Sequence, residues 1–318
     1  MTGGAGYVGS VLVPFLVASG RSVRVLDSLL HGGVRSLLAS WSDERFEFVR
    51  SDVRDESAVD AALADAAEVV HLAAVVGDPA CSREPDEARA VNLDSTRRLL
   101  ELAERGGVGR FVFASTCSNY GKMADSDAYA TEEWELTPVS LYAETKVAAE
   151  LETLARSSAG FATTCLRLAT VYGASPRMRF DLTVNEFTRD VCVNREVVVY
   201  GEQFWRPYVH VRDAAQAFVV ALDSPAEAVA GEVFNVGSSG ENYRKLDIVE
   251  LLRERVPDAE YQFVHKDEDP RDYRVSFDKI TSILGFGTTR DVAGGIDEVA
   301  ELLESGLVDD PFAGMYRN

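Results

Sequence analysis

The chain has 318 residues, of which 46% are hydrophobic and 26% are charged, values that are ordinary for a globular protein with one large domain or two lobes. Its 32 basic and 52 acidic residues give a net charge of −20, which argues against nucleic acid or an anionic membrane as a partner. The composition is also poor in lysine, a pattern that fits either a high-salt cytoplasm or an ordinary acidic surface.

The sequence shows neither a membrane anchor nor a secretion signal. No run of about 18 apolar residues is present, and Met1 leads directly into a glycine-rich loop. We therefore expect a cytoplasmic protein. The cysteines, at positions 81, 117, 165 and 192, are far apart and include no Cys-x-x-Cys pair, so we expect neither a metal site nor a disulfide framework.

Apolar periodicity and turn residues predict an alternation of short strands and helices through the first 170 or so residues. In chain order, the expected segments are helix 8–18, strand 22–26, strand 46–49, helix 56–63, strand 69–74, helix 85–105, strand 110–114, helix 141–157 and strand 163–168. This alternation is typical of βαβ units, and it predicts an α/β fold with a doubly wound, mainly parallel sheet.

The pattern changes near residue 174, where the spacing of strands and helices becomes less regular. The expected segments are then helix 182–193, strand 197–200, helix 211–222, strand 233–236, helix 246–256 and helix 291–303. Because no linker or internal repeat separates the halves, we expect a smaller C-terminal lobe that is interleaved with the first domain.

A glycine-rich loop opens the chain. Gly3, Gly6 and Gly9 form a Gly-x-x-Gly-x-x-Gly pattern at the start of the helix expected at 8–18. Glycine lets backbone N–H groups and a helix N-terminus approach a pyrophosphate, because no Cβ intervenes. Asp27 ends the next strand, 18 residues after Gly9, near the spacing at which a carboxylate binds a cofactor ribose. A carboxylate there repels a 2′-phosphate, so the pattern favours NAD over NADP; helix packing and turn capping are the structural alternatives.

Such a loop normally follows a β-strand, and only Met1 and Thr2 precede it here. Without a strand of about five residues at this place, the neighbouring strands lose ladder hydrogen bonds and a layer of the core. Either the start codon is placed late or this chain lacks its first strand. We therefore expect an open slot beside the loop and weak retention of NAD.

A tyrosine and a lysine lie one turn apart on the helix expected at 141–157. Tyr142 and Lys146 share one face of that helix. A nearby positive charge can lower the pKa of a phenol, which makes the phenolate accessible as a proton acceptor. The strand at 110–114 delivers the hydroxyls of residues 115 and 116 to the same edge of the sheet. The Tyr-x-x-x-Lys spacing is common in helices, so by itself it leaves catalysis and chance both open.

Several motifs in order carry a resemblance to a known family. The stretches TGGAGYVG, HLAA, FASTCSNYG, YAETK and RPYVHVRDAA together resemble the extended short-chain dehydrogenase/reductases, and more narrowly the nucleotide-sugar epimerases and dehydratases. The resemblance implies a Rossmann-like NAD-binding domain at 1–173, to which 205–236 return, and a substrate-binding lobe at 174–204 and 237–318. It also implies a nucleotide-diphosphate sugar as substrate and a homodimer packed through helices 86–105 and 141–157.

The same resemblance implies roles for individual residues. The implied catalytic residues are Thr116, Tyr142 and Lys146. The implied cofactor-binding residues are Gly3, Gly6, Tyr7, Val8, Gly9, Asp27, Asp52, Val53, Ala73, Ala74, Tyr142 and Lys146. The implied substrate-binding residues are Thr116, Cys117, Thr170, Asn185, Arg206 and Arg271. Arg206 and Arg271 would hold the diphosphate, with Arg274 as a rival for Arg271 and surface ion pairing as the alternative for both.

One departure from the family pattern bears on the reaction. Dehydratases of this family that remove water across C5 and C6 carry Asp-Glu after the catalytic Thr, whereas Cys117 and Ser118 stand here. A thiol and a hydroxyl are poor acids and bases near neutral pH without strong activation. We therefore favour NAD-dependent epimerisation at C4 through a transient 4-keto sugar. Cys117 either serves epimerisation at another carbon or fills the strand end.

Other activities remain open at this point. A 4-ketoreductase or a dehydratase would use the same fold, and a non-catalytic NAD-binding regulator would belong to a different class of protein. A regulator would not need the Tyr142–Lys146 pair, so the presence of both residues favours an enzyme.

Overall fold

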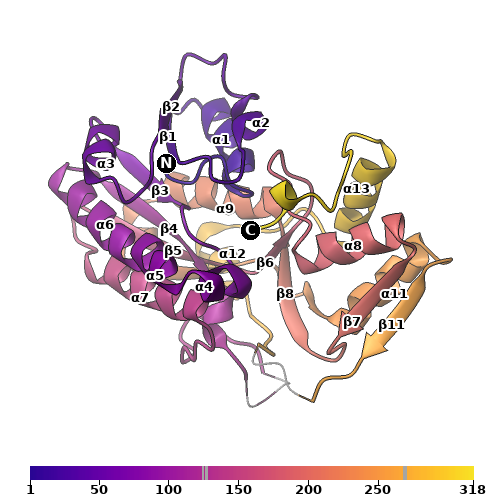
Figure 1. The fold of residues 1–318 in the computed structure, drawn as a ribbon. Helices are drawn as coiled ribbons and strands as arrows, with labels where there is room; N and C mark the ends of the chain where they lie inside the picture. The colour runs from indigo at the N-terminus through magenta and orange to yellow at the C-terminus, as the bar shows by residue number, and fades with distance from the viewer. Residues whose placement is uncertain (124, 126–127, 268–270) are drawn as a thin grey trace.

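The computed structural model describes residues 1–123, 125, 128–267 and 271–318. Figure 1 shows a larger part built on a parallel sheet and a smaller part that contains α8, α11, α13, β7 and β11. The predicted α/β fold is thereby confirmed.

The larger sheet consists of two blocks of parallel strands. The first block is β1 (Val23–Asp27) beside β2 (Phe46–Arg50). The second has the order β3 (Glu68–His71), β4 (Arg110–Thr116), β5 (Ala162–Leu168) and β9 (Glu232–Val236). Thr2 joins the blocks, because it pairs in parallel with both Leu26 and His71.

Helices cover both faces of this sheet. On one face α1 (Gly9–Ala18) packs on α9 (Val211–Asp223); on the other lie α3 (Glu56–Ala62), α6 (Ser95–Arg105) and α7 (Leu141–Ala155). Successive residues of a strand point to opposite faces. Accordingly, Phe111 and Phe113 of β4 join the core under α6 and α7, while Val112 joins the core under α1 and α9.

The smaller part has its own core. Its elements are β6 (Thr170–Tyr172), α8 (Thr183–Val193), β7 (Glu196–Tyr200), β8 (Trp205–His210), β10 (Asn242–Arg244), α11 (Lys245–Arg255), β11 (Glu260–Val264) and α13 (Val292–Glu304). β8 lies between β6 and β10, and β7 pairs with β11. Tyr172, Phe187 and Ile248 are among the residues that fill the space between these elements.

The segment expected as one helix at 85–105 is interrupted. It consists of α5 (Pro85–Arg89), a wider π-helical turn at Ala90–Asp94, and α6. Asn92 of the wide turn is buried, and its side chain exchanges two hydrogen bonds with the backbone of Val75, at 2.8 and 3.0 Å. The turn therefore fixes the segment that follows β3.

Short elements escaped the sequence analysis because they offer too few residues for a periodic pattern. These are α2 (Val34–Leu37), α4 (Asp78–Arg83), β6, β10, α10 (Ala226–Val229) and α12 (Asp278–Leu284). The longer strands β8 and β11 were also missed, because Pro207 interrupts one and alternation is weak in the other.

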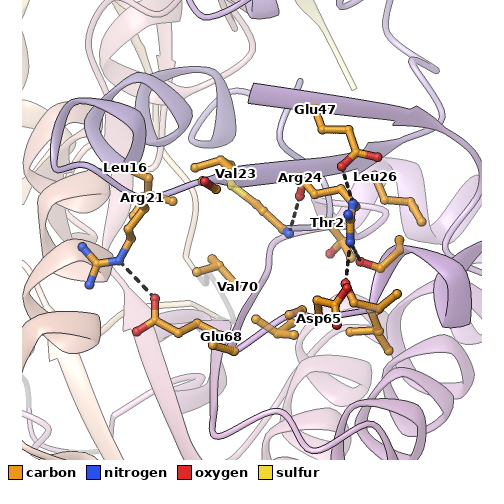
Figure 2. A pocket seen from close by; sticks show the side chains of 18 of the residues that line it. Thr2, Leu16, Arg21, Val23, Arg24, Leu26, Glu47, Asp65, Glu68 and Val70 are labelled. Atoms are coloured by element: carbon orange, nitrogen blue, oxygen red, sulfur yellow. Dashed lines mark hydrogen bonds and ion pairs between the residues drawn. The ribbon is translucent and has the colours of Figure 1, made fainter. Parts of the chain in front are cut away.

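A cavity of about 560 Å³ lies beside the glycine-rich loop, between β1 and β3 (Figure 2). Leu16, Val23 and Val70 contribute to its wall. The first residue of the chain reaches it: the Met1 ammonium donates to the carbonyl of Arg24 at 2.7 Å, and burial lowers the pKa of this ammonium to about 5. The cavity lies between the two strands where the sequence analysis expected a slot.

Candidate active site

The glycine-rich loop is a tight turn against the end of β3. Gly3 has φ +72°, and a Cβ on it would lie 2.6 Å from the backbone nitrogen of Ala73. A Cβ on Gly9 would lie 2.3 Å from the carbonyl oxygen of Gly3. Both positions therefore require glycine. No side chain caps the N-terminus of α1, whose residues are all described, so the positive end of this helix is open to an anion.

Asp27 organises this loop from the end of β1. One carboxylate oxygen accepts from the backbone N–H of Ala5 at 3.0 Å, and the other accepts from Leu29 at 2.8 Å. Burial raises the pKa of Asp27, and these two hydrogen bonds oppose the increase. The half-buried carboxylate thus stands beside the glycines, as a ribose contact requires.

The other predicted cofactor residues differ in their surroundings. Asp52 pairs with the guanidinium of Arg54 at 2.6 Å, which lowers the pKa of Asp52. Val53 is buried in the core with Leu26, while Ala73 and Ala74 are half-buried at the end of β3. The open helix N-terminus, the glycine cradle and the carboxylate fit NAD.

The structure brings Thr116 and Tyr142 together. β4 ends at Thr116, whose side-chain oxygen accepts from the N–H of Ser118 at 3.1 Å. Tyr142 lies in the first turn of α7, which Ser140 caps by accepting from the N–H of Ala143 at 3.3 Å. The Thr116 hydroxyl lies close enough to Tyr142 to influence the pKa of its phenol. The hydroxyls of Thr116 and Tyr142 therefore lie close together, where the sequence analysis placed the reacting oxygen of the substrate.

Without a ligand, Tyr142 is a neutral phenol. Burial raises its pKa, while the charge of Arg179 and the nearby hydroxyl of Thr116 act in the opposite direction. The ammonium of Lys146 donates to the carbonyl of Ala114 at 2.9 Å and lies 4.6 Å from the centre of the Phe113 ring. Lys146 thus binds the backbone of β4 in this structure, and its expected effect on the pKa of Tyr142 stays a prediction.

The burial of Lys146 predicts a pH dependence of stability. Burial lowers its pKa from 10.5 to about 8, so the folded protein disfavours the charged ammonium. This destabilisation is fully present below pH 8. Between about pH 8 and 10.5 the unfolded chain keeps the Lys146 proton that the folded protein has lost, so the destabilisation is relieved as the pH rises. Relative to Lys146→Met, the wild type should gain roughly 3 kcal/mol of unfolding free energy across this window. Urea titrations of both proteins at several pH values measure the gain, and parallel curves would contradict it.

A buried ion pair lies next to the end of β4. The Arg167 Nε lies 3.1 Å from an oxygen of Glu150, and that oxygen accepts from the Ser115 hydroxyl at 2.6 Å. Both charged side chains are almost fully buried. Ser115 immediately precedes Thr116, so this pair helps to fix the end of β4.

Removing one member of this pair should be strongly destabilising. Glu150→Gln leaves the Arg167 charge buried without its partner, and we expect a loss of about 3–5 kcal/mol in unfolding free energy. Glu152→Gln is a matched control on the same helix, because Glu152 pairs with Arg97 at the surface at 2.9 Å. This variant should lower the unfolding free energy by less than about 1 kcal/mol. Urea unfolding of both variants tests this, and equal midpoints would contradict it.

Two of the predicted substrate residues point into the protein. Cys117 is fully buried, and its thiol faces the carbonyl of Arg167 at 3.2 Å; burial raises the pKa of this thiol. Asn185 is also fully buried, accepting from the N–H of Gly173 at 2.9 Å and donating to the carbonyl of Arg179 at 2.9 Å. These placements argue against contact with a substrate. They favour the alternative of a filled strand end for Cys117, and they show that Asn185 supports the loop from Gly173 to Arg179.

The two predicted diphosphate residues and Thr170 lie in different surroundings. The guanidinium of Arg206 in β8 lies 5.5 Å from the ring centre of Tyr273, whose hydroxyl is 3.4 Å from that of Ser118. Arg206 is thus linked to the end of β4. Arg271 pairs with Asp78 of α4 at 3.0 Å, and Thr170 is half-buried at the start of β6.

Residues that the sequence analysis did not select also build the site. Asp78 accepts from the Ser140 hydroxyl at 2.6 Å, so it connects α4 with the cap of the helix that carries Tyr142. Tyr273 lies between Arg206 and Ser118. A serine just before an expected helix is a capping signal, which could have identified Ser140; Asp78 and Tyr273 carry no local signal.

A family model described as the NAD dependent epimerase/dehydratase family matches residues 1–237. The chain belongs to this family. It therefore uses NAD, as the glycine loop and Asp27 predicted.

Members of this epimerase/dehydratase family with different reactions are similar over nearly the whole chain. A dTDP-glucose 4,6-dehydratase of Actinoplanes sp. is 32% identical, covering 94% of this chain and 95% of its own. A UDP-glucose 4-epimerase of Mycolicibacterium smegmatis is 30% identical, covering 96% and 98%. The crystal structure of DesIV, a dTDP-glucose 4,6-dehydratase from Streptomyces venezuelae with NAD and TYD bound, is 28% identical and covers 96% of each chain with a TM-score of 0.84.

Within the described ranges, no helix combines the length and apolar character that crossing a membrane requires.

Proposed function

We propose that this family member is an NAD-dependent epimerase that acts at C4 of a nucleotide-diphosphate sugar. The observation that carries the proposal is that the side chains of Thr116 and Tyr142 lie close together at the end of β4, with Cys117 and Ser118 directly after Thr116. The Cys117 thiol is turned into the core, and Ser118 faces Tyr273. These two positions therefore offer no acid–base pair for removing water from the sugar.

In the proposed reaction, Tyr142 as phenolate removes the proton of the C4 hydroxyl, and Thr116 donates a hydrogen bond to the same oxygen. NAD, when bound, supplies the acceptor for the hydride from C4 and the donor for its return. The 4-keto sugar exposes its other face to the hydride, after which Tyr142 gives the proton back to the oxygen. Lys146 favours the phenolate by its positive charge. The cycle consumes no cofactor.

A dehydratase is the second candidate, because the similar protein from Actinoplanes is a dTDP-glucose 4,6-dehydratase. The deciding experiment mixes the purified protein with UDP-, dTDP-, GDP- and CDP-sugars without added reduced cofactor, and analyses the products by mass spectrometry and NMR. A product of unchanged mass with inverted C4 supports the epimerase. A product lighter by one water selects the dehydratase. If turnover begins only after NADH is added in a second series of assays, the ketoreductase is selected. No turnover with any sugar in either series favours the regulator.

We also propose a homodimer formed through α6 and α7. These helices lie side by side, with Arg97 of α6 and Glu152 of α7 joined at 2.9 Å, and Leu151 of α7 is exposed. A sedimentation mass of one chain at micromolar concentration would contradict the dimer. A cytoplasmic location is a further proposal, which cell fractionation would test.

A further inference from the structure

A buried arginine near the glycine-rich loop lacks partners for part of its guanidinium. Arg177, between β6 and α8, is 5% exposed, and within the described chain its Nε and Nη1 have no hydrogen-bond partner. Its Nη2 donates to the Arg317 carbonyl at 2.9 Å and to the Asn318 side chain at 2.8 Å. A buried cation with donors that lack acceptors is unfavourable, and such a group indicates an anionic ligand.

The backbone around Arg177 is tied to the first turn of α1. The N–H of Arg177 donates to the Ser10 hydroxyl at 3.4 Å, and the Ser175 hydroxyl donates to the carbonyl of Tyr7 at 2.7 Å. The hydroxyls of Ser10 and Ser175 are 2.9 Å apart. Arg177 is therefore held next to the open helix N-terminus, which itself favours an anion.

The charges around Arg177 are mostly positive. Burial, followed by the charge of Arg179, lowers the pKa of Arg177 to about 10. Burial also lowers the pKa of His31, and both arginines add to this effect. The acid in this cluster is Asp181, which already binds Arg179 at 2.7 Å and the N–H of Asn318 at 3.2 Å. His31 follows β1 and Asp27 in the chain, so the segment after the expected ribose contact comes near this cluster.

We propose that Arg177 is a further cofactor-binding residue, which donates a hydrogen bond to the pyrophosphate of NAD above the N-terminus of α1. The pyrophosphate joins the ribose expected at Asp27 to the nicotinamide half of the cofactor, so it must cross this space. The proposal rests on NAD binding by the family and is independent of the sugar and of the carbon that reacts.

The competing explanation is that Arg177 only anchors the C-terminal residues, which lie between the two parts of the molecule (Figure 1). The variant Asn318→Ala separates the two explanations, because it removes the side-chain contact of the tail and leaves the guanidinium intact. Arg177→Gln removes the charge, and Arg177→Lys keeps it.

The test is calorimetric titration of cofactor-free protein with NAD and with ADP-ribose, which shares the pyrophosphate but lacks the nicotinamide. We expect Arg177→Gln to raise the Kd of both ligands by about 10- to 100-fold, as loss of a hydrogen bond to a charged group predicts. Arg177→Lys should recover part of this loss, and Asn318→Ala should change either Kd by less than about threefold. Circular dichroism and melting temperature verify that each variant is folded.

Three results would overturn the proposal: an unchanged Kd in Arg177→Gln, a loss for NAD without a loss for ADP-ribose, or an equal loss in Asn318→Ala. If Arg177→Gln does not fold, Arg177→Lys decides, because an unchanged Kd ratio between NAD and adenosine would exclude a phosphate contact. Failure of the C4-epimerase proposal leaves these results unaffected, because no sugar is present.

Discussion

Replacing Tyr142 with phenylalanine is expected to lower kcat for sugar epimerisation by about 10²- to 10⁴-fold, the range typical for loss of a positioned acid–base group. The substitution removes the hydroxyl that lies near Thr116 and leaves the ring in the first turn of α7. The rate is measured by NMR with the sugar that the product assay identifies. The Kd for NAD should change by less than about threefold, because the glycine loop and Asp27 are untouched.

Tyr261→Phe is the matched control for this experiment. Tyr261 lies in β11 of the smaller part, and its hydroxyl donates to the carbonyl of Val256 at 3.0 Å. Loss of the Tyr261 hydroxyl should leave kcat within about twofold of the wild type. If Tyr142→Phe keeps more than about a tenth of the wild-type kcat, Tyr142 does not carry the proton in this reaction.

Filling the cavity between β1 and β3 is expected to give the largest gain in stability. We predict that an apolar extended segment such as Met-Lys-Val-Leu, joined to the amino group of Met1, pairs with both strands and raises the unfolding free energy by about 3–5 kcal/mol. Thr2 already pairs in parallel with Leu26 and His71, so the added residues enter in that direction. The amide bond also replaces the buried Met1 ammonium, whose pKa is lowered to about 5.

The measurement is thermal unfolding, in which a gain of this size corresponds to about 5–10 °C in melting temperature. The control is a Gly-Ser segment of the same length, which has no side chains to fill the cavity and should change the melting temperature by less than about 2 °C. We also expect the apolar segment to tighten NAD binding, because Thr2 and Gly3 directly follow it. Equal melting temperatures for the two extended proteins would show that the cavity does not accept a strand.

Local patterns were sufficient for most of the larger part. The periodicity at 141–157 predicted α7 within two residues of its observed end, and short apolar runs predicted β4 and β5. The glycine spacing and Asp27 together predicted NAD, because the backbone conformation and the charge that this cofactor needs are properties of short segments. The slot beside β1 was predictable for the same reason, since the loop normally continues a strand.

The placement of side chains between distant segments was decided by tertiary packing. The sequence placed Cys117 near the site, but the pairing of β4 with β5 turns its thiol toward Arg167. The spacing of Tyr142 and Lys146 predicted that the lysine charge acts on the phenol, whereas the structure shows the lysine donating to the carbonyl of Ala114 in the neighbouring strand.

Around the glycine-rich loop, too, local sequence decided some features and tertiary packing decided others. The sequence by itself determined the fold class, the family and the cofactor, because these depend on residues a few positions apart. Only the tertiary structure placed Arg177 beside Ser10, from which it is 167 residues distant in the chain, because the segment after β6 packs onto the start of α1. No local pattern contains that contact, since it arises when two separately formed elements bury their surfaces against each other.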